Sequence, residues 1–375
     1  MASTTVSRPE ASSLSTKLQA ISAELKDEYL QAHDKPWIIG FSGGKDSTLV
    51  LQLVFDLLLR LPPSRRTRPV HVLSNDTLVE SPVVQAYIDR VLGELSAAVE
   101  ALNVSMVVKK TTPDPDGTFW VNLIGRGYPA PNRLFRWCTD RMKIRPTTAY
   151  MREQISKAGE VILLLGVRRL ESSARAKVVG RYSSGGRLNP HNDMKGCLIF
   201  RPIVELTTEE VWMTLLQSRP PWGGSHRDLA TLYRNADGGE CPFVTDGADV
   251  PSCGTSSSRF GCWTCTVVEK DRSMQGFIDN GFDHLEPLAA FRDWLKEFSR
   301  DPQNRMNERR NGHEGMGPFT LLARREILQQ VQQAARTTGL PLISQAEVER
   351  IEQIWLDDQS MLAVRKADRL LALIE

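Results

Sequence analysis

Residues of types that can bind phosphate stand together in a short loop, residues 42–47, which reads Ser-Gly-Gly-Lys-Asp-Ser. It follows an apolar stretch at 37–41 and leads into a helical pattern. Glycines let backbone N–H groups approach an anion, and a helix N-terminus adds its dipole and unpaired donors. Asp46 could also ligate Mg²⁺. We predict that the phosphates of ATP are held by Ser42, Gly43, Gly44, Lys45, Asp46 and Ser47.

This loop is not a Walker A loop, which needs Gly-x4-Gly-Lys-Ser/Thr. Here Gly44-Lys45 is followed by Asp46, and the residue five positions before Gly44 is Ile39. The loop therefore holds a polyphosphate by a different pattern.

Cys138 lies in a strongly cationic stretch of the chain. Cationic neighbours stabilise a thiolate and lower the pKa of a cysteine, as a sulfur nucleophile or carrier requires. A buried structural cysteine is the competing interpretation. Cys197, just before an apolar stretch, is most simply a core residue. The cations that surround Cys138 are Arg133, Arg136, Arg141, Lys143 and Arg145.

Four further cysteines are spaced C-x11-C-x8-C-x2-C. A CxxC pair is a bidentate clamp, and two more thiolates complete a tetrahedral zinc site or an iron–sulfur site. Spacing alone does not separate zinc from iron–sulfur. The predicted ligands are Cys241, Cys253, Cys262 and Cys265.

In the sequence, apolar strands alternate with helices. This alternation indicates an α/β fold with a mostly parallel sheet covered on both faces, and this sheet must position the groups described above. Such sheets bind ligands at the carboxyl ends of their strands. We expect Asp76 and Thr77 there, near adenosine. Gly166 is expected beside them, with Arg168 and Arg175 on phosphate oxygens. The predicted strands are 37–41, 69–73, 104–108, 161–167 and 198–203.

Changes in composition and in hydrophobic pattern divide the chain into four parts. The regions are an N-terminal helix (1–34), a domain that carries the nucleotide loop (35–236), a four-cysteine segment (237–270) and a helical C-terminal region (271–375), with helices at 287–299, 319–336 and 345–373. Capping boxes are expected at Thr207 and Ser344.

Composition narrows the class of protein. Hydrophobic residues make up 41% and charged residues 25%, as in globular proteins. The net charge of +2 does not by itself argue for nucleic acid, but two arginine-rich clusters beside the nucleotide loop favour a polyanion. We expect no membrane span and a cytoplasmic protein, in which six cysteines favour a metal site or a catalytic thiol over disulfides.

The loop at 42–47 resembles the PP-loop signature of the N-type ATP pyrophosphatase superfamily. Trp137-Cys138-Thr139 with Lys143 resembles a segment of its PAPS reductase-like branch, as does the stretch from Gly166 to Arg175. Residues 73–82 and the cysteine group most resemble the DndC-like sulfurtransferases of bacterial DNA phosphorothioation.

That resemblance implies an ATP-dependent sulfurtransferase that releases AMP and pyrophosphate. It would adenylylate an oxygen of a DNA backbone phosphate and replace it with sulfur, with Lys45 and Asp46 acting on ATP and Cys138 carrying sulfur. The resemblance also implies Mg²⁺, a [4Fe–4S] cluster on the four cysteines, and as partners DNA, a cysteine desulfurase and other phosphorothioation proteins.

Three alternatives stay open. One is a PAPS or adenylylsulfate reductase, although the chain has neither a cysteine after 265 nor an adjacent cysteine pair. A second is a PP-loop enzyme that thiolates RNA. The third is a non-catalytic DNA-binding or scaffold subunit, against which the intact Lys45 and Asp46 argue.

Overall fold

The structure is a computed structural model, and it describes residues 13–169, 186–236 and 260–371. A six-stranded sheet forms its centre, with strand order β3-β2-β1-β4-β6-β5. All neighbouring strands are parallel except β5 and β6. The strands are β1 (Trp37–Phe41), β2 (Val70–Asn75), β3 (Met106–Thr111), β4 (Val161–Leu164), β5 (Leu188–Pro190) and β6 (Cys197–Phe200).

Helices cover both faces of the sheet, because the central strands carry apolar side chains on both sides. In β1, Trp37 and Ile39 belong to the large hydrophobic cluster that includes α1 and α2. Ile38, between them, packs with residues of α5 in a second cluster. The helices of this part are α1 (Leu14–Tyr29), α2 (Lys45–Arg60), α3 (Pro82–Ala101), α4 (Trp137–Thr139), α5 (Arg145–Ala158), α7 (Thr208–Gln217) and α8 (His226–Ala236).

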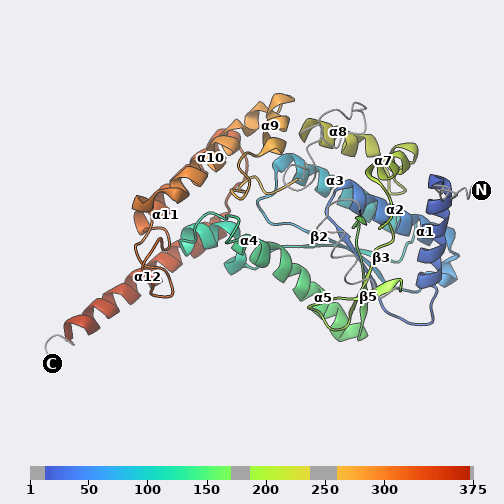
Figure 1. Cartoon of the computed structure of the whole chain (residues 1–375), viewed down its shortest axis with the longest axis horizontal. Coiled ribbons are helices and arrows are strands. Elements are labelled where there is room, and N and C mark those ends of the chain that lie inside the picture. The colour runs from blue at the N-terminus through green and yellow to red at the C-terminus, as the bar shows by residue number, and fades with distance from the viewer. Residues whose placement is uncertain (1–12, 170–185, 237–259, 372–375) are drawn as a thin grey trace, which may run out of the picture.

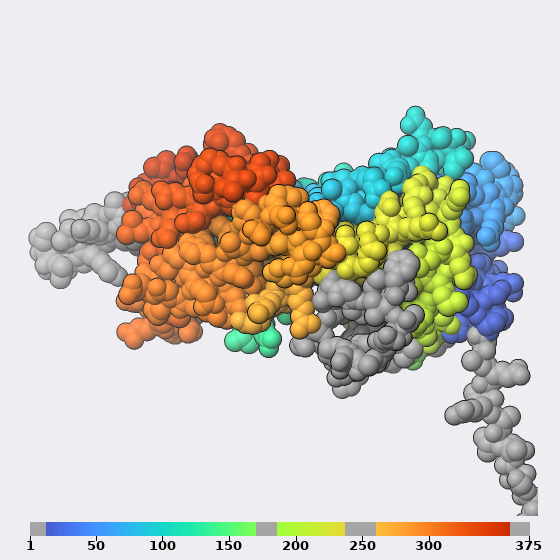
Figure 2. Space-filling view, turned by 90° about the horizontal axis from the view of Figure 1, so that it is seen from above, coloured from blue at the N-terminus to red at the C-terminus, as the bar shows by residue number. Residues whose placement is uncertain are grey.

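The C-terminal part is helical and extends from one end of the sheet, so that α1 and α12 lie at opposite ends of the molecule in Figure 1. Figure 2 shows the same division from above, with the orange and red helices beside the sheet domain. The helices of the C-terminal part are α9 (Arg272–Asp279), α10 (Glu286–Arg300), α11 (Leu321–Thr338) and α12 (Gln345–Leu371).

The C-terminal helices share a hydrophobic core with the sheet domain. They pack on a π-helix, η3 (Val121–Gly125), that precedes α4. Trp120 donates to the Leu342 carbonyl at 2.6 Å, and Trp355 of α12 donates to the Ile124 carbonyl at 3.0 Å. These buried indole bonds fix the helical part against the segment that leads to Cys138.

Most elements agree with the sequence prediction, and the α/β fold is confirmed. Pro82 opens α3, and Thr207 with Glu210 forms the expected capping box. The prediction of a strand to residue 167 was wrong, because β4 ends at Leu164 and the chain then turns toward the loop at 42–47. Among the described residues no helix is both long and apolar enough to cross a membrane.

Candidate active site

The loop at 42–47 joins β1 to α2 at the carboxyl edge of the sheet. Gly43 has a φ of +74°, and a Cβ there would lie 2.6 Å from Cγ1 of Ile88. Gly44 is the N-cap of α2 and makes no side-chain capping bond. Because both glycines keep side chains out of this turn, the N-terminus of α2 stays accessible to an anion.

Two backbone N–H groups of this loop donate hydrogen bonds to side-chain hydroxyls. The Ser42 N–H donates to Oγ of Ser47 at 3.2 Å, and the Lys45 N–H donates to the Tyr233 hydroxyl at 3.3 Å. The Lys45 ammonium also lies over the Tyr233 ring, 5.3 Å from its centroid. These donors face hydroxyl oxygens that phosphate oxygens can replace. Tyr233 comes from α8, and sequence reasoning missed it.

Arg168 reaches the loop from the segment after β4. Its Nε donates to Oδ1 of Asp46 at 2.6 Å, and the side chain is only 1% exposed. Its Nη2 has no hydrogen-bond partner among the described residues. A buried guanidinium nitrogen without a partner costs free energy, so an anionic ligand would satisfy it.

Gly166 explains how this segment comes so close. A Cβ at Gly166 would lie 2.7 Å from the Asp46 carbonyl carbon, against backbone that cannot move aside. The structure therefore brings Gly166 and Arg168 to the loop. Arg175, the other expected phosphate ligand, lies outside the described residues.

The magnesium role predicted for Asp46 does not fit this arrangement. One carboxylate oxygen accepts from Arg168, and the other lies 3.4 Å from the Lys45 ammonium. With both oxygens facing cations, the carboxylate holds the side chains of Arg168 and Lys45 beside the loop.

Asp76 and Thr77 follow β2 at the same edge, but both have partners within the protein. Oδ1 of Asp76 accepts from the Leu78 N–H at 2.8 Å, and Oδ2 lies 3.1 Å from the Lys110 ammonium. Thr77 is fully buried and donates to Glu80 at 2.9 Å. Their predicted contact with adenosine therefore stays a prediction.

Glu80 lies at the centre of a second cluster of polar side chains at this edge of the sheet. Its Oε1 lies 3.3 Å from the Lys143 ammonium and 3.8 Å from Sγ of Cys262. Burial alone lowers the pKa of Lys143, but the charges of Cys262 and Glu80 outweigh it and raise that pKa. Lys143 therefore stays a cation beside a thiol and a carboxylate.

Cys262 and Cys265 lie on one tight turn, in which the Cys265 N–H donates to the Cys262 carbonyl at 3.0 Å. Trp263 joins this turn to the residues after β2 through a bond to the Val79 carbonyl, also at 3.0 Å. Burial raises the pKa of the Cys262 thiol. The turn therefore presents two thiols at the carboxyl edge of the sheet.

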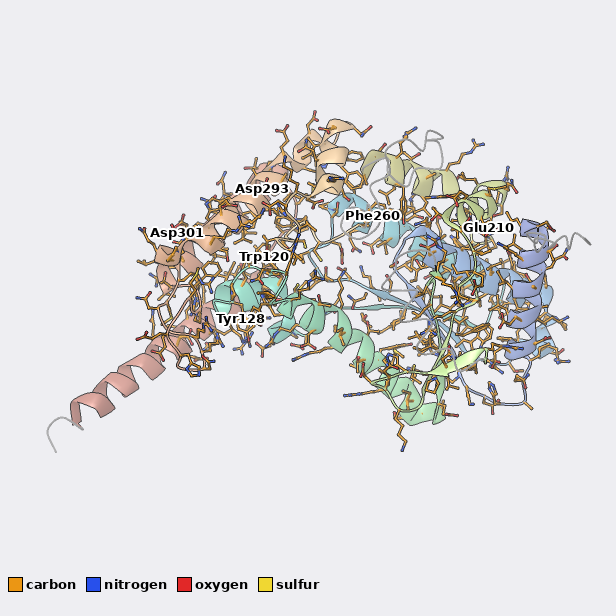
Figure 3. All side chains as sticks on the ribbon, in the orientation of Figure 1. Trp120, Tyr128, Glu210, Phe260, Asp293 and Asp301 are labelled. Carbon is orange, nitrogen blue, oxygen red and sulfur yellow. The ribbon has the colours of Figure 1, made fainter. Side chains whose placement is uncertain are left out.

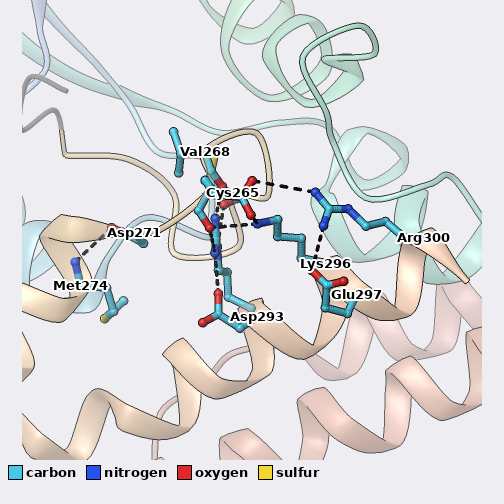
Figure 4. A network of polar contacts seen from close by, with 10 residues as sticks. Cys265, Val268, Asp271, Met274, Asp293, Lys296, Glu297 and Arg300 are labelled. Carbon is cyan, nitrogen blue, oxygen red and sulfur yellow. Dashed lines mark hydrogen bonds and ion pairs between the residues drawn. The ribbon is translucent and has the colours of Figure 1, made fainter. Parts of the chain in front are cut away.

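The same turn is fixed to α10 by buried cations (Figure 4). Arg292, only 1% exposed, donates from Nε to the Cys265 carbonyl at 2.9 Å. Lys296 donates to the Glu269 carbonyl at 3.0 Å. This anchoring keeps the turn rigid without using either thiol.

The structure describes only two of the four predicted thiolate ligands. Cys241 and Cys253 lie outside the described residues. Within the described ranges no group of three potential ligands is arranged to hold a metal ion. The Cys262–Cys265 pair supplies half of a tetrathiolate set, and the cluster stays a prediction.

Cys138 lies in α4, half-buried, at the start of a continuous helical segment that runs into α5. Burial raises the pKa of its thiol, and the charge of Cys265 raises it further. The expected lowering by surrounding arginines is therefore wrong, since the thiol points into packed protein. Asn75 at the end of β2 donates to the Met142 carbonyl at 2.9 Å, so the segment that follows Cys138 lies at the same edge of the sheet as the turn of Cys262 and Cys265.

A parallel sheet with a glycine loop leading into a helix at its carboxyl edge is an architecture with which α/β proteins bind nucleotide phosphates. Residues 36–268, more than half of the chain, match the phosphoadenosine phosphosulfate reductase domain family. The chain belongs to this family.

Individual relatives are distant. An uncharacterised protein of Methanocaldococcus jannaschii is 24% identical over 188 residues, which are 50% of this chain and 33% of that protein. The chain thus spans about a third of this curated relative.

Solved structures show only weak similarity. PAPS reductase from Candida auris has a TM-score of 0.34 at 12% identity, covering 58% of this chain and 89% of that one. The U34-tRNA thiolase NcsA from Methanococcus maripaludis, solved with its [4Fe-4S] cluster, has a TM-score of 0.34 at 13% identity, covering 76% and 79%. NAD+ synthetase from Burkholderia pseudomallei reaches 0.37 at 12%, covering 88% and 92%.

Proposed function

We propose that this protein is an ATP-dependent sulfurtransferase that places sulfur in the DNA backbone. The observation that carries the proposal is the position of Arg168, a buried guanidinium with one unsatisfied nitrogen, at a glycine loop that opens a helix. Thiols of Cys138, Cys262 and Cys265 share the same edge of the sheet. A phosphate-binding group and a set of thiols are the two components that sulfur transfer to an activated phosphate needs.

ATP binding would use the loop and its neighbours. The pyrophosphate portion would take the N–H groups of Ser42 and of Lys45 at the start of α2, displacing the hydroxyls of Ser47 and Tyr233. Lys45 and Arg168, both buried and both held by Asp46, would balance its negative charge. These residues orient the triphosphate so that its α-phosphorus can be attacked.

The first step would be adenylylation. A non-bridging oxygen of the DNA phosphate attacks the α-phosphorus of ATP and forms a P–O–P bond, while the bond to pyrophosphate breaks. This step makes AMP the leaving group on the DNA phosphorus. An unactivated phosphate oxygen is too poor a leaving group for a sulfur nucleophile to displace.

The second step would transfer sulfur. The terminal sulfur of a persulfide on Cys138 attacks the DNA phosphorus, forms a P–S bond and expels AMP. A second thiol then attacks the Cys138 sulfur, which breaks the S–S bond, leaves a phosphorothioate and converts the two thiols to a disulfide. Because Cys265 is a proposed cluster ligand, this second thiol would come from a thiol reductant in solution, which then forms the mixed disulfide with Cys138.

Persulfide loading would come from a cysteine desulfurase. Burial raises the pKa of the Cys138 thiol and so disfavours the thiolate that accepts sulfur, which means that a base on the desulfurase would have to remove this proton during loading. A [4Fe–4S] cluster on Cys241, Cys253, Cys262 and Cys265 would supply sulfur-binding, redox-active iron beside this residue. Other phosphorothioation proteins would complete the assembly.

Reduction of an adenylylated sulfate is the second candidate function, and the family match favours it. It would use the same nucleotide loop and the same thiols, without ATP cleavage or DNA. Thiol-dependent sulfite release from PAPS in the absence of ATP would establish this reaction and exclude our first proposal.

The experiment that tests the first proposal is mass spectrometry of nuclease-digested DNA from cells with and without this protein. We expect sulfur-containing dinucleotides only when the protein is present, and their loss with Lys45→Ala. Sulfur in RNA nucleosides instead of DNA would assign the protein to RNA thiolation. Purified protein should meanwhile release AMP and pyrophosphate in equal amounts.

A further inference from the structure

An exposed turn, Asn132 to Arg136, directly precedes Trp137 and Cys138. Leu134 at its tip is 98% exposed, more than any other large hydrophobic side chain of the described residues, and Phe135 is 45% exposed. We call these two residues the apolar tip. Apolar side chains held in water beside a candidate active site need a physical reason, and a binding partner is the usual one.

The turn is rigid, although it is exposed. Oδ1 of Asn132 accepts from the N–H groups of Leu134 and Phe135 at 2.9 and 3.0 Å. The Asn132 and Phe135 backbones also exchange two bonds of 3.3 Å. The apolar tip is therefore presented in one conformation, which lowers the entropy cost of binding.

Both ends of the turn are attached to the protein interior. Just before it, the Pro131 carbonyl accepts from Thr266 at 2.6 Å, and the Ala130 N–H donates to Ser299 of α10 at 3.1 Å. Just after it, the Trp137 indole donates to the Pro129 carbonyl at 2.9 Å. A partner held by the tip would thus be held at a fixed place relative to Cys138.

The surroundings of the tip are cationic. Arg133 and Arg136 flank it, both exposed, and neither makes an ion pair within the described part of the chain. Behind Phe135, 6.1 Å away between ring centroids, lies Tyr128, which Figure 3 shows on the segment beside the C-terminal helices. Two more cations lie over the Tyr128 ring, at 5.3 and 4.8 Å from its centroid: Arg141 and Arg310.

We propose that this turn is a nucleic-acid contact that brings a backbone phosphate to Cys138. The apolar tip contacts bases, by stacking or by wedging between them, and the two flanking arginines contact phosphates on either side. The inference deepens the proposed function and rests on it, because it supplies the surface on which the acceptor strand lies.

Charge favours nucleic acid over a protein partner. Arg133, Arg136 and Arg141 carry three positive charges without carboxylate partners in the described chain, whereas the exposed Asp140 is paired with Arg145 at 2.7 Å. Apolar side chains between unpaired arginines match alternating bases and phosphates.

The test measures binding of fluorescein-labelled duplex DNA, single-stranded DNA and RNA of the same length by fluorescence anisotropy, with the full chain purified anaerobically. We expect the double variant L134S/F135S to weaken binding about 10-fold or more. The double variant R133A/R136A should lower the slope of log affinity against log salt by about 2. A 2-aminopurine base in the probe should report base unstacking with the wild type and not with L134S/F135S.

Leu102→Ser is the matched control, because Leu102 is also 45% exposed and caps the far end of α3. It should bind as the wild type does. Equal DNA binding by L134S/F135S overturns the inference and leaves the proposed function standing. If the protein binds RNA but not DNA, and this binding depends on the apolar tip, the turn is a nucleic-acid contact but DNA is not the acceptor. If the protein binds none of the three probes, the turn is not a nucleic-acid contact. The use of ATP is then still tested separately by pyrophosphate release.

Discussion

Nε of Arg168 lies 2.6 Å from Oδ1 of Asp46, which ties the segment after β4 to the first turn of α2. We predict that Arg168→Lys raises the Kd for ATP about 10- to 100-fold, because lysine keeps the charge but loses the planar fork that binds two oxygens. Calorimetric titration with a non-hydrolysable ATP analogue measures this effect.

Arg169→Lys is the control for that prediction. Arg169 is the adjacent residue, exposed and paired with Glu205 at 2.7 Å, so its substitution should leave nucleotide affinity unchanged. Equal loss of affinity in both variants would mean that the segment after β4, and not the buried guanidinium, is what matters.

Gly166→Ala tests the close approach of this segment to the loop. Its new Cβ would lie 2.7 Å from the backbone of Asp46, so the loop must shift and ATP binding should be lost. Gly93→Ala is the matched control, since Gly93 lies exposed within α3 with no atom within 4 Å of the added Cβ. It should stabilise the fold by up to about 1 kcal/mol. Thermal unfolding and ATP titration of both variants measure the contrast, and normal ATP affinity in Gly166→Ala would contradict the geometry.

Cys138→Ser separates the two proposed steps. Because serine cannot carry a persulfide, sulfur incorporation should fall to background, while ATP-dependent pyrophosphate release persists. Cys197→Ala, in the core at the start of β6, should retain both activities. Full phosphorothioation in a cell with Cys138→Ser would remove this residue from the mechanism.

The cysteine group predicts a visible chromophore. Anaerobically purified protein should be brown, and Cys262→Ser or Cys265→Ser should bleach it by removing one thiolate of the CxxC pair. Iron and zinc analysis together with the absorbance spectrum measures the outcome. A colourless wild type that contains zinc would reject the iron–sulfur assignment.

Local features of this chain could be predicted from its sequence, and so could the approach of Gly166 and Arg168 to the loop at 42–47, because parallel strands place their carboxyl ends at one edge. Other tertiary contacts could not be predicted. The glycine loop, the Pro82 start of α3 and the Thr207 capping box depend on residues within a few positions of each other. Tyr233 meets Lys45 across 188 positions of sequence, so no local pattern indicates it. The raised pKa of Cys138 also depends on burial by the folded chain, which the cationic residues beside it in sequence do not indicate.

His226 gives a prediction about stability rather than activity. It is buried at the start of α8, bonded to Gln52 of α2 and next to the Trp222 ring. Burial lowers its pKa from 6.5 to about 4, so the folded protein holds it neutral. The charged groups around the same small cavity are the Arg90–Asp228 ion pair and Glu94.

The sign of the effect follows from proton counts. Between pH 6.5 and 4 the unfolded chain binds a proton at His226 and the folded chain does not, so acid favours unfolding. The contribution is fully present above pH 6.5 and is lost as the pH falls toward 4. Urea unfolding at pH 7.5 and 4.5 should show that wild type loses about 2 kcal/mol more than His226→Gln does. Because carboxylates titrate in both proteins, only the difference reports on His226, and equal losses would show that this histidine accepts a proton in the folded state.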